Sequence, residues 1–138
     1  MAIYGYTSCG IACTPAADLT ATNANQRYAA RLDTTAANDL NGNPTATLTG
    51  TTATAIEVLG EYETYDNAAV RIKTGGVLIL RASAAYAAAN NGFGVVASAT
   101  AGIVQVAATI GTGLGKIIGG GTENIGGSDV NVLRVLVE

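Results

Sequence analysis

The sequence predicts a mainly β protein: a small antiparallel β-barrel or sandwich with an extended, partly irregular N-terminal arm and at most one or two short helices. Three observations predict this class. Short apolar runs separated by Gly-containing turns follow one another from residue 54 onward. Hydrophobic residues make up 49% of the chain, enough to form a core. A length of 138 residues fits one domain.

The first 52 residues predict an arm. Large apolar side chains are sparse there, and most positions hold Ala, Thr, Asn or Asp, a composition that buries little surface on its own. The pattern also allows one helix, with Thr14 as N-cap, Pro15 at the first helical position and apolar residues continuing to Leu32. The cluster Asn41-Gly-Asn-Pro44 favours a turn. We therefore expect an arm over residues 1–52 and a barrel core over residues 53–138.

The barrel core begins with strand signals of period two. Apolar and charged residues alternate over residues 56–63 and again over residues 70–73, which indicates half-buried strands. The turn Thr74-Gly75-Gly76 predicts a hairpin into residues 77–80. Because that second run is apolar throughout, we expect it to be buried on both faces.

The remaining strands follow after a short helical turn. Residues 83–90 favour the turn by propensity, and residues 94–97 and 103–106 predict further strands. The chain closes on residues 130–137, the strongest strand signal present. Val95–Leu114 is uncharged and long enough to span a bilayer, but its repeated Gly and Thr residues favour buried strands with turns over a membrane span.

Composition and charge exclude several classes of function. The chain contains no His, so no imidazole base or His metal ligand can act. A formal charge of −3 argues against nucleic acid as a partner. Cys9 and Cys13 alone cannot close a tetrahedral zinc site, and we expect them to be reduced thiols. Residues 1–6 lack the basic and apolar regions of a secretory signal, so we expect synthesis in the cytoplasm.

Two motif fragments resemble ligand sites but lack essential positions. The run Gly111–Lys116 suggests a phosphate loop, yet Ile110 stands where its first Gly belongs and Ile117 where a hydroxyl should follow the Lys. Asp39–Asn43 matches the first half of a calcium loop, and its second half is missing. We interpret both as ordinary loops and expect neither cofactor nor metal.

The acidic cluster gives no basis for catalysis. Glu57, Glu61, Glu63 and Asp66 lie close together in the sequence, and paired carboxylates can carry out acid–base chemistry when burial raises one pKa. No oxyanion donors or lid can be argued around them, and the serines have no His partner. We interpret the cluster as a solvated strand face and expect no enzymatic activity.

The surface inference points toward assembly. Charged residues are only 12% of the chain, and interface cores are depleted of charge. The aromatic residues are candidates for either core or interface positions, since they are enriched in both. They include Tyr62, Tyr65, Tyr86 and Phe93. The N-terminal arm could become ordered when it meets a partner.

Three stretches together resemble a known family: residues 67–77, residues 101–106, and residues 115–121 leading to 132–137. Over roughly residues 54–138 the chain is similar to the small β-barrel head decoration, or cement, proteins of tailed bacteriophages. The likeness lies in Gly turns, Val-rich strands, an Ala/Gly/Thr/Val composition and the scarcity of His and Trp. The first fifty residues depart from the short N-terminus of that family.

The resemblance implies a structural virion protein without catalysis or cofactor, bound to the outer surface of the capsid. Its implied partners are the major capsid protein and further copies of itself, with a trimer favoured, and neither nucleic acid nor membrane. The contact residues we expect are Tyr4, Tyr6 and Ile11 in the arm and Tyr62 and Tyr65 on the core. The alternatives are a tail-tube or tail-fibre subunit and a secreted adhesive β-domain.

Overall fold

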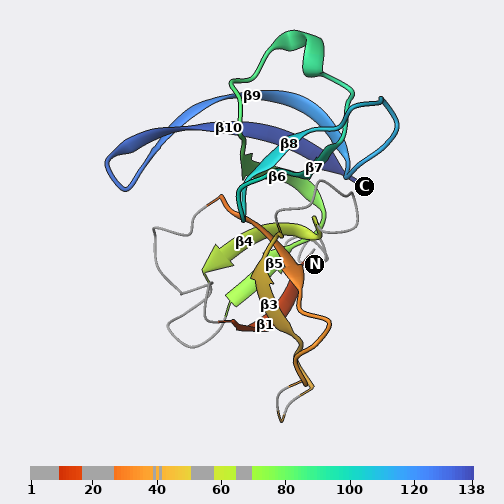
Figure 1. The fold of residues 1–138 in the computed structure, drawn as a ribbon, viewed down its shortest axis with the longest axis vertical. Helices are drawn as coiled ribbons and strands as arrows, with labels where there is room; N and C mark the ends of the chain where they lie inside the picture. The colour runs from red at the N-terminus through yellow and green to blue at the C-terminus, as the bar shows by residue number, and fades with distance from the viewer. Residues whose placement is uncertain (1–9, 17–26, 39, 41, 51–57, 65–69) are drawn as a thin grey trace, which may run out of the picture.

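The structure of the chain is a computed structural model, which describes residues 10–16, 27–38, 40, 42–50, 58–64 and 70–138 (Figure 1). Strands dominate this part of the chain, and one short 3-10 helix interrupts them. The elements in chain order are β1 (Gly10–Pro15), β2 (Ala29–Leu32), β3 (Thr45–Leu48), β4 (Gly60–Thr64), β5 (Val70–Lys73), β6 (Gly76–Arg81), η3 (Ala88–Asn90), β7 (Val95–Ala97), β8 (Val104–Val106), β9 (Lys116–Ile125) and β10 (Ser128–Val137).

The first five strands form a closed barrel in the order β1-β3-β2-β4-β5. β5 pairs back onto β1, with Ile72 opposite Ile11. The β1–β3 pair is parallel and the other pairs are antiparallel. The buried interior combines the small residues Cys13, Ala30 and Ala46 with two large ones, Tyr62 and Ile72.

This barrel corrects the expected division near residue 52. The described residues of the expected arm include β1, β2 and β3, which are barrel strands. Thr14 and Pro15 lie in β1, so no helix begins there. Small residues proved compatible with a core because Tyr62 and Ile72, contributed by later strands, fill the barrel between them. The rest of the expected arm, residues 1–9, 17–26, 39, 41 and 51–52, lies outside the described residues.

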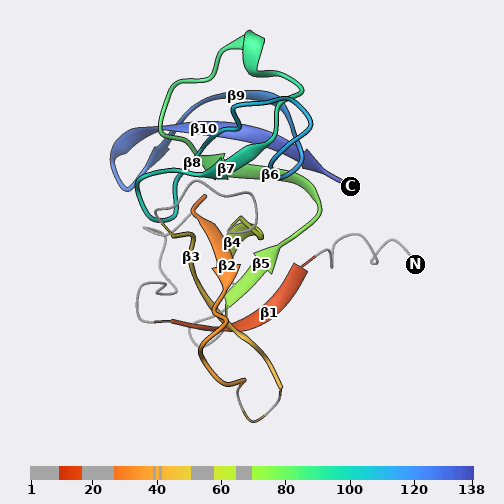
Figure 2. The ribbon, with the colours of Figure 1, turned by 45° about the vertical axis from the view of Figure 1, so that its right-hand side comes forward.

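A three-stranded antiparallel sheet, ordered β6-β10-β9, lies over the barrel (Figure 1, Figure 2). The β9–β10 hairpin turns at Gly126 and Gly127, whose φ angles of 64° and 89° are those that a type I′ turn requires. The two-stranded sheet β7–β8 packs against the three-stranded one. Together they bury the larger core, which includes Leu78, Leu80, Val95, Val104, Ile117, Leu133 and Val135.

The predicted hairpin at residues 74–76 is wrong. β5 pairs with β1 and β4, whereas β6 pairs with β10, so the chain leaves the barrel at this turn and enters the other sheet. Gly76, with a φ of 80°, permits the change of direction. Burial also alternates along β6, because Leu78 and Leu80 are fully buried while Val77 and Ile79 are half-buried.

The predicted mainly β class is confirmed. Strands appear within 94–97, 103–106 and 130–137 as expected, while the helical turn expected over 83–90 is reduced to η3. Val95–Leu114 forms β7, β8 and their loops, so the strand interpretation of that uncharged stretch is confirmed. Among the described residues, no helix has the length and apolarity to cross a membrane.

Candidate functional site

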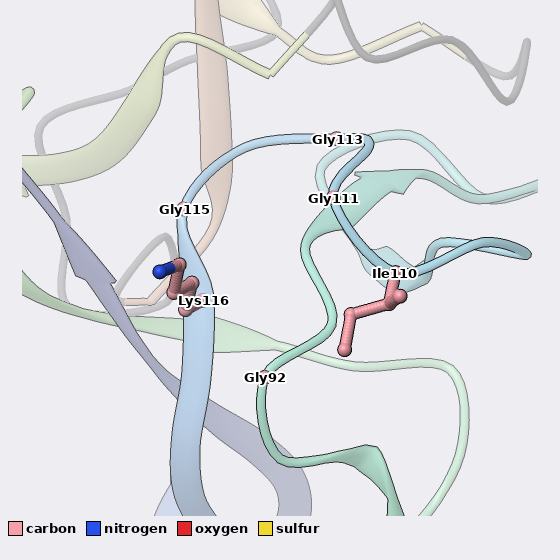
Figure 3. Close-up of a pocket in the computed structure, with 6 residues that line it drawn as sticks. All are labelled: Gly92, Ile110, Gly111, Gly113, Gly115 and Lys116. Atoms are coloured by element: carbon pink, nitrogen blue, oxygen red, sulfur yellow. The ribbon is translucent and has the colours of Figure 1, made fainter.

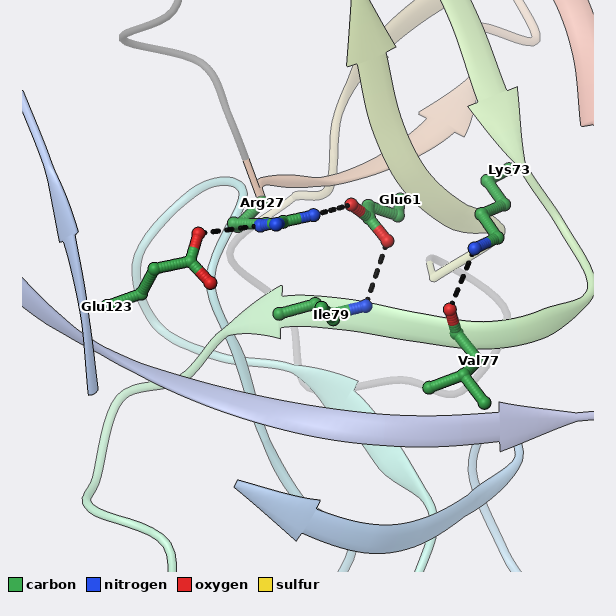
Figure 4. A network of polar contacts seen from close by, with 6 residues as sticks. All are labelled: Arg27, Glu61, Lys73, Val77, Ile79 and Glu123. Atoms are coloured by element: carbon green, nitrogen blue, oxygen red, sulfur yellow. Dashed lines mark hydrogen bonds and ion pairs between the residues drawn. The ribbon is translucent and has the colours of Figure 1, made fainter. Parts of the chain in front are cut away.

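Arg27 joins the barrel to the three-stranded sheet through two ion pairs (Figure 4). Its Nη1 donates to Glu61 Oε2 on β4 at 2.9 Å, and its Nε donates to Glu123 Oε1 on β9 at 2.8 Å. The backbone of Arg27 has a φ of 67°, the left-handed region that non-Gly residues seldom adopt. The fold thus holds Arg27 in an uncommon conformation at the point where its guanidinium can reach both carboxylates.

Glu61 is buried at this junction, with a relative exposure of 4%. Its second oxygen, Oε1, accepts a 2.8 Å hydrogen bond from the backbone N–H of Ile79 on β6. Burial raises the pKa of Glu61 above its ordinary value, against the opposing effects of the Ile79 hydrogen bond, Arg27 and Lys73. Both carboxylate oxygens of Glu61 are therefore occupied in binding the two sheets together.

The barrel also covers the outer edge of β6 at two further points. Lys73 Nζ donates to the carbonyl oxygen of Val77 at 2.9 Å (Figure 4). The N–H of Arg81 donates to the carbonyl oxygen of Arg27 at 2.7 Å. With the Glu61–Ile79 bond, these contacts satisfy alternate backbone groups along an edge that would otherwise be open. We assign this cluster a structural role.

The Gly-rich run lines a cleft of about 420 Å³ (Figure 3). Lys116 is the one charged residue in its lining, and its amine points away from Ile110 on the other side. The remaining lining residues are Gly92, Gly111, Gly113 and Gly115. Lys116 begins strand β9, so the helix that follows a phosphate loop is replaced by a strand here.

The glycines of this run have a structural explanation. The loop passes so close to β7 that Leu114 and Val95 exchange backbone hydrogen bonds of 2.9 and 3.1 Å. A side-chain carbon on Gly113 would lie 2.7 Å from the carbonyl oxygen of Val95. The interpretation of residues 111–115 as a loop is confirmed, and it leads from β8 to β9.

The expected contact residues are not gathered into one exposed patch among the described residues. Tyr62 is 2% exposed and fills the barrel core, so it has almost no surface to offer a partner. Ile11 lies in β1 and packs partly buried against the same core. Both are better explained as core residues of the barrel. Tyr4, Tyr6 and Tyr65 lie outside the described residues.

The described residues of the acidic cluster do not share one environment. The solvated-face interpretation is wrong for Glu61, which is buried, while Glu63 is half-buried opposite Arg71. Glu57 and Asp66 lie outside the described residues. Sequence reasoning missed Arg27 and Glu123, because they are separated by 96 positions and nothing local to either one signals the pair.

Cys13 is a buried free thiol in the barrel. Burial raises the pKa of the Cys13 thiol to about 11, and Cys9 lies outside the described residues. In the part of the chain that the structure describes, no three His, Cys, Asp or Glu side chains are grouped to hold a metal ion.

The exposed surface of the β9–β10 hairpin mixes charged, small and apolar residues, and Lys116, Asp129 and Arg134 are its exposed charged side chains. Side chains or backbone are exposed at Ile118, Gly120, Gly121, Thr122 and Asn124 along β9. Ile118, at 46% exposure, is one of the large apolar side chains left on the surface, and a register shift in the β9–β10 ladder falls beside it. Because the core of a protein–protein interface is more apolar than the rest of a surface, Ile118 is a candidate contact residue.

No protein-family model matches the chain, and searches of curated proteins and of solved structures found no significant match.

Proposed function

We propose that this chain is a structural virion protein that decorates and cements the outer surface of a tailed-phage capsid by bridging major capsid protein subunits. The observation that carries the proposal is the long β9–β10 hairpin with the exposed apolar side chain of Ile118, joined to a closed barrel by part-buried ion pairs. In this proposal the protein acts without catalysis or cofactor, and it associates with itself, a trimer being the favoured form.

Two properties of the molecule support this role. A surface with few charges loses little solvation free energy when another protein covers it. The contacts of Arg27 and Glu61 tie the barrel to the sheet, so a load applied to one is transmitted to the other. When each copy touches several shell subunits, modest individual contacts combine into high avidity.

The expected contact residues change in part. Tyr4, Tyr6 and Tyr65 stay in the proposal. Ile118 and Ile110, the exposed apolar side chains at the sheet end of the molecule, replace Tyr62 and Ile11.

Binding to capsids tests the proposal. Purified protein is titrated onto expanded heads that lack it, and bound copies are counted against the major capsid protein after sedimentation. We expect saturation at a simple ratio to the shell subunits, and a lower affinity for Ile118→Asp than for the matched hairpin variant Asp129→Asn. Absence of binding to heads would contradict the proposal, and binding to purified tails would favour the tail alternative.

A further inference from the structure

The two edges of the three-stranded sheet differ in how far their backbone groups are hydrogen-bonded. The β6 edge is covered by the barrel through the contacts to Val77, Ile79 and Arg81. The β9 edge is covered only at its beginning, among the described residues. There Ile117 donates to the carbonyl oxygen of Phe93 at 2.7 Å and accepts from the N–H of Gly92 at 2.9 Å.

Beyond Ile117 the β9 edge is open. The two-residue turn at Gly126-Gly127 makes Ile125 and Ser128 a hydrogen-bonded pair, and bonding then alternates along the ladder. The residues whose backbone groups point away from β10 are Gly120, Thr122 and Asn124. The described structure contains no hydrogen bond to these outward groups.

We propose that this open edge of β9 pairs antiparallel with the same edge of a second copy, around a two-fold axis at Thr122. We choose a second copy as the partner because it carries the same open edge, so identical backbone groups on the two copies can pair. Continuation of the sheet from copy to copy in one direction would need an open β6 edge, and the barrel covers that edge. Joining β9 to β9 needs one open edge on each copy and closes as a dimer.

The side chains are compatible with this register of the pairing. With Thr122 opposite Thr122 of the second copy, Gly120 faces Asn124 and Glu123 faces Gly121. Each outward pair can then exchange two N–H···O bonds. A shift that centres the axis on Glu123 would place two carboxylates directly opposite each other, which is unfavourable. The glycines at 119–121 present no side chain that could block the approach.

The inference goes beyond the proposed function and does not depend on it. Strand pairing of this kind builds a dimer, so a trimer on a capsid would have to use another surface of the molecule.

Analytical ultracentrifugation and backbone amide exchange together test the pairing. As protein concentration rises, we expect a monomer–dimer equilibrium, with slower exchange at Gly120, Thr122 and Asn124. The amides of Gly121 and Glu123 bond to β10 and should be protected at every concentration. A monomer at all concentrations, or a dimer whose outward amides stay unprotected, would overturn the proposal.

A proline on the open edge gives the second test. Thr122→Pro removes an outward N–H that makes no bond in the monomer, and proline is tolerated on edge strands. We expect dimerisation at least about tenfold weaker than for the control Thr122→Ser. Asn124→Pro carries the same expectation. Protected Gly121 amides would show that a variant hairpin is folded, and undiminished dimerisation by such a variant would refute the pairing.

Discussion

Glu61 brings a carboxylate into the junction between the barrel and the three-stranded sheet, where Arg27 and the Ile79 N–H use both of its oxygens. Burying a charge in this way is unfavourable unless all of its partners are in place. The charges that face it come from three segments: Arg27 directly, Lys73 across the β4–β5 ladder, and Glu123 through Arg27.

Removing the Glu61 carboxylate should therefore destabilise the fold. Glu61→Ala leaves the Ile79 N–H without its acceptor and removes one of the two carboxylates that Arg27 bonds. We expect a loss of about 3 kcal/mol in the free energy of unfolding, measured by urea denaturation. The matched control is Glu63→Ala, on the same strand but half-buried, with an expected loss below about 1 kcal/mol. Equal losses of unfolding free energy for the two variants would show that the contacts of Glu61 at the junction do not contribute more to stability than an ordinary half-buried residue.

The raised pKa of Glu61 gives a pH dependence of known sign. The folded chain holds this proton more tightly than the unfolded chain, so the contribution of Glu61 to stability is complete at acidic pH. It is lost as pH rises through the raised folded pKa. Wild type should therefore lose stability relative to Glu61→Gln as pH rises from about 4.3, the ordinary pKa of a glutamate, toward neutral pH.

Urea titrations of both proteins across this range measure the difference. The opposite contribution of Asp33, whose pKa is lowered by hydrogen bonds from Thr35, is common to both and cancels. A constant difference across the range would contradict the account of Glu61.

Cys13 should be unreactive while the barrel is folded. Its thiol is buried, and burial raises its pKa to about 11, so little thiolate forms near neutral pH. In a Cys9→Ala variant we expect alkylation of Cys13 to follow the unfolding transition in denaturant. Rapid labelling of the native variant, followed by mass spectrometry, would disprove the burial of this side chain.

At the scale of elements, β9 shows how a glycine-rich segment becomes a strand. Gly120 lies beneath Tyr86, and a side-chain carbon at this position would be 2.7 Å from Tyr86 Cβ and from the Val132 carbonyl oxygen. Gly121, the next residue, has open space where its side chain would be. The tyrosine covers the strand where it has no side chain of its own.

The two neighbouring glycines form a matched pair for a test. Gly120→Ala should cost about 1–3 kcal/mol, because Tyr86 or the backbone must move. Gly121→Ala should be neutral or slightly stabilising, since alanine restricts the unfolded chain more than glycine does. Thermal or urea unfolding measures both, and equal effects would argue against the packing of Tyr86 on β9.

Local sequence patterns predicted where several strands lie, but they did not predict which strands pair with each other. The alternation at 70–73 and the apolar run at 130–137 identify β5 and β10. Both signals come from residues that are neighbours in the sequence, so they can be recognised without knowing the fold. The destination of the chain after Gly76 depends on β10, more than fifty positions away, and no local signal carries that information. The small residues of β1–β3 looked like an arm because their burial depends on Tyr62 and Ile72.

The candidate sites were predictable to the same limited extent. The missing positions of the phosphate-loop pattern correctly indicated a plain loop at residues 111–115. The Arg27 junction is formed by charges that are remote in sequence, so it was found only in the structure. From composition alone, Tyr62 could have been either a core residue or an interface residue. Its burial in the structure shows that it is a core residue.

At the scale of the whole molecule, the barrel covers one edge of the three-stranded sheet, and the other edge is open beyond Ile117 among the described residues. This arrangement offers surfaces for other proteins on a barrel and a sheet that part-buried ion pairs hold together. The proposed place of such a body is the outside of a phage head, where many copies act together.

The copy number of the chain in virus particles tests this central claim most directly. Quantitative mass spectrometry of purified tailed-phage particles from the source lysate would count the chain against the major capsid protein. We predict a ratio near one, or a simple fraction of it. A few copies per particle would point to the tail, and complete absence from the particles would contradict the structural role in the capsid.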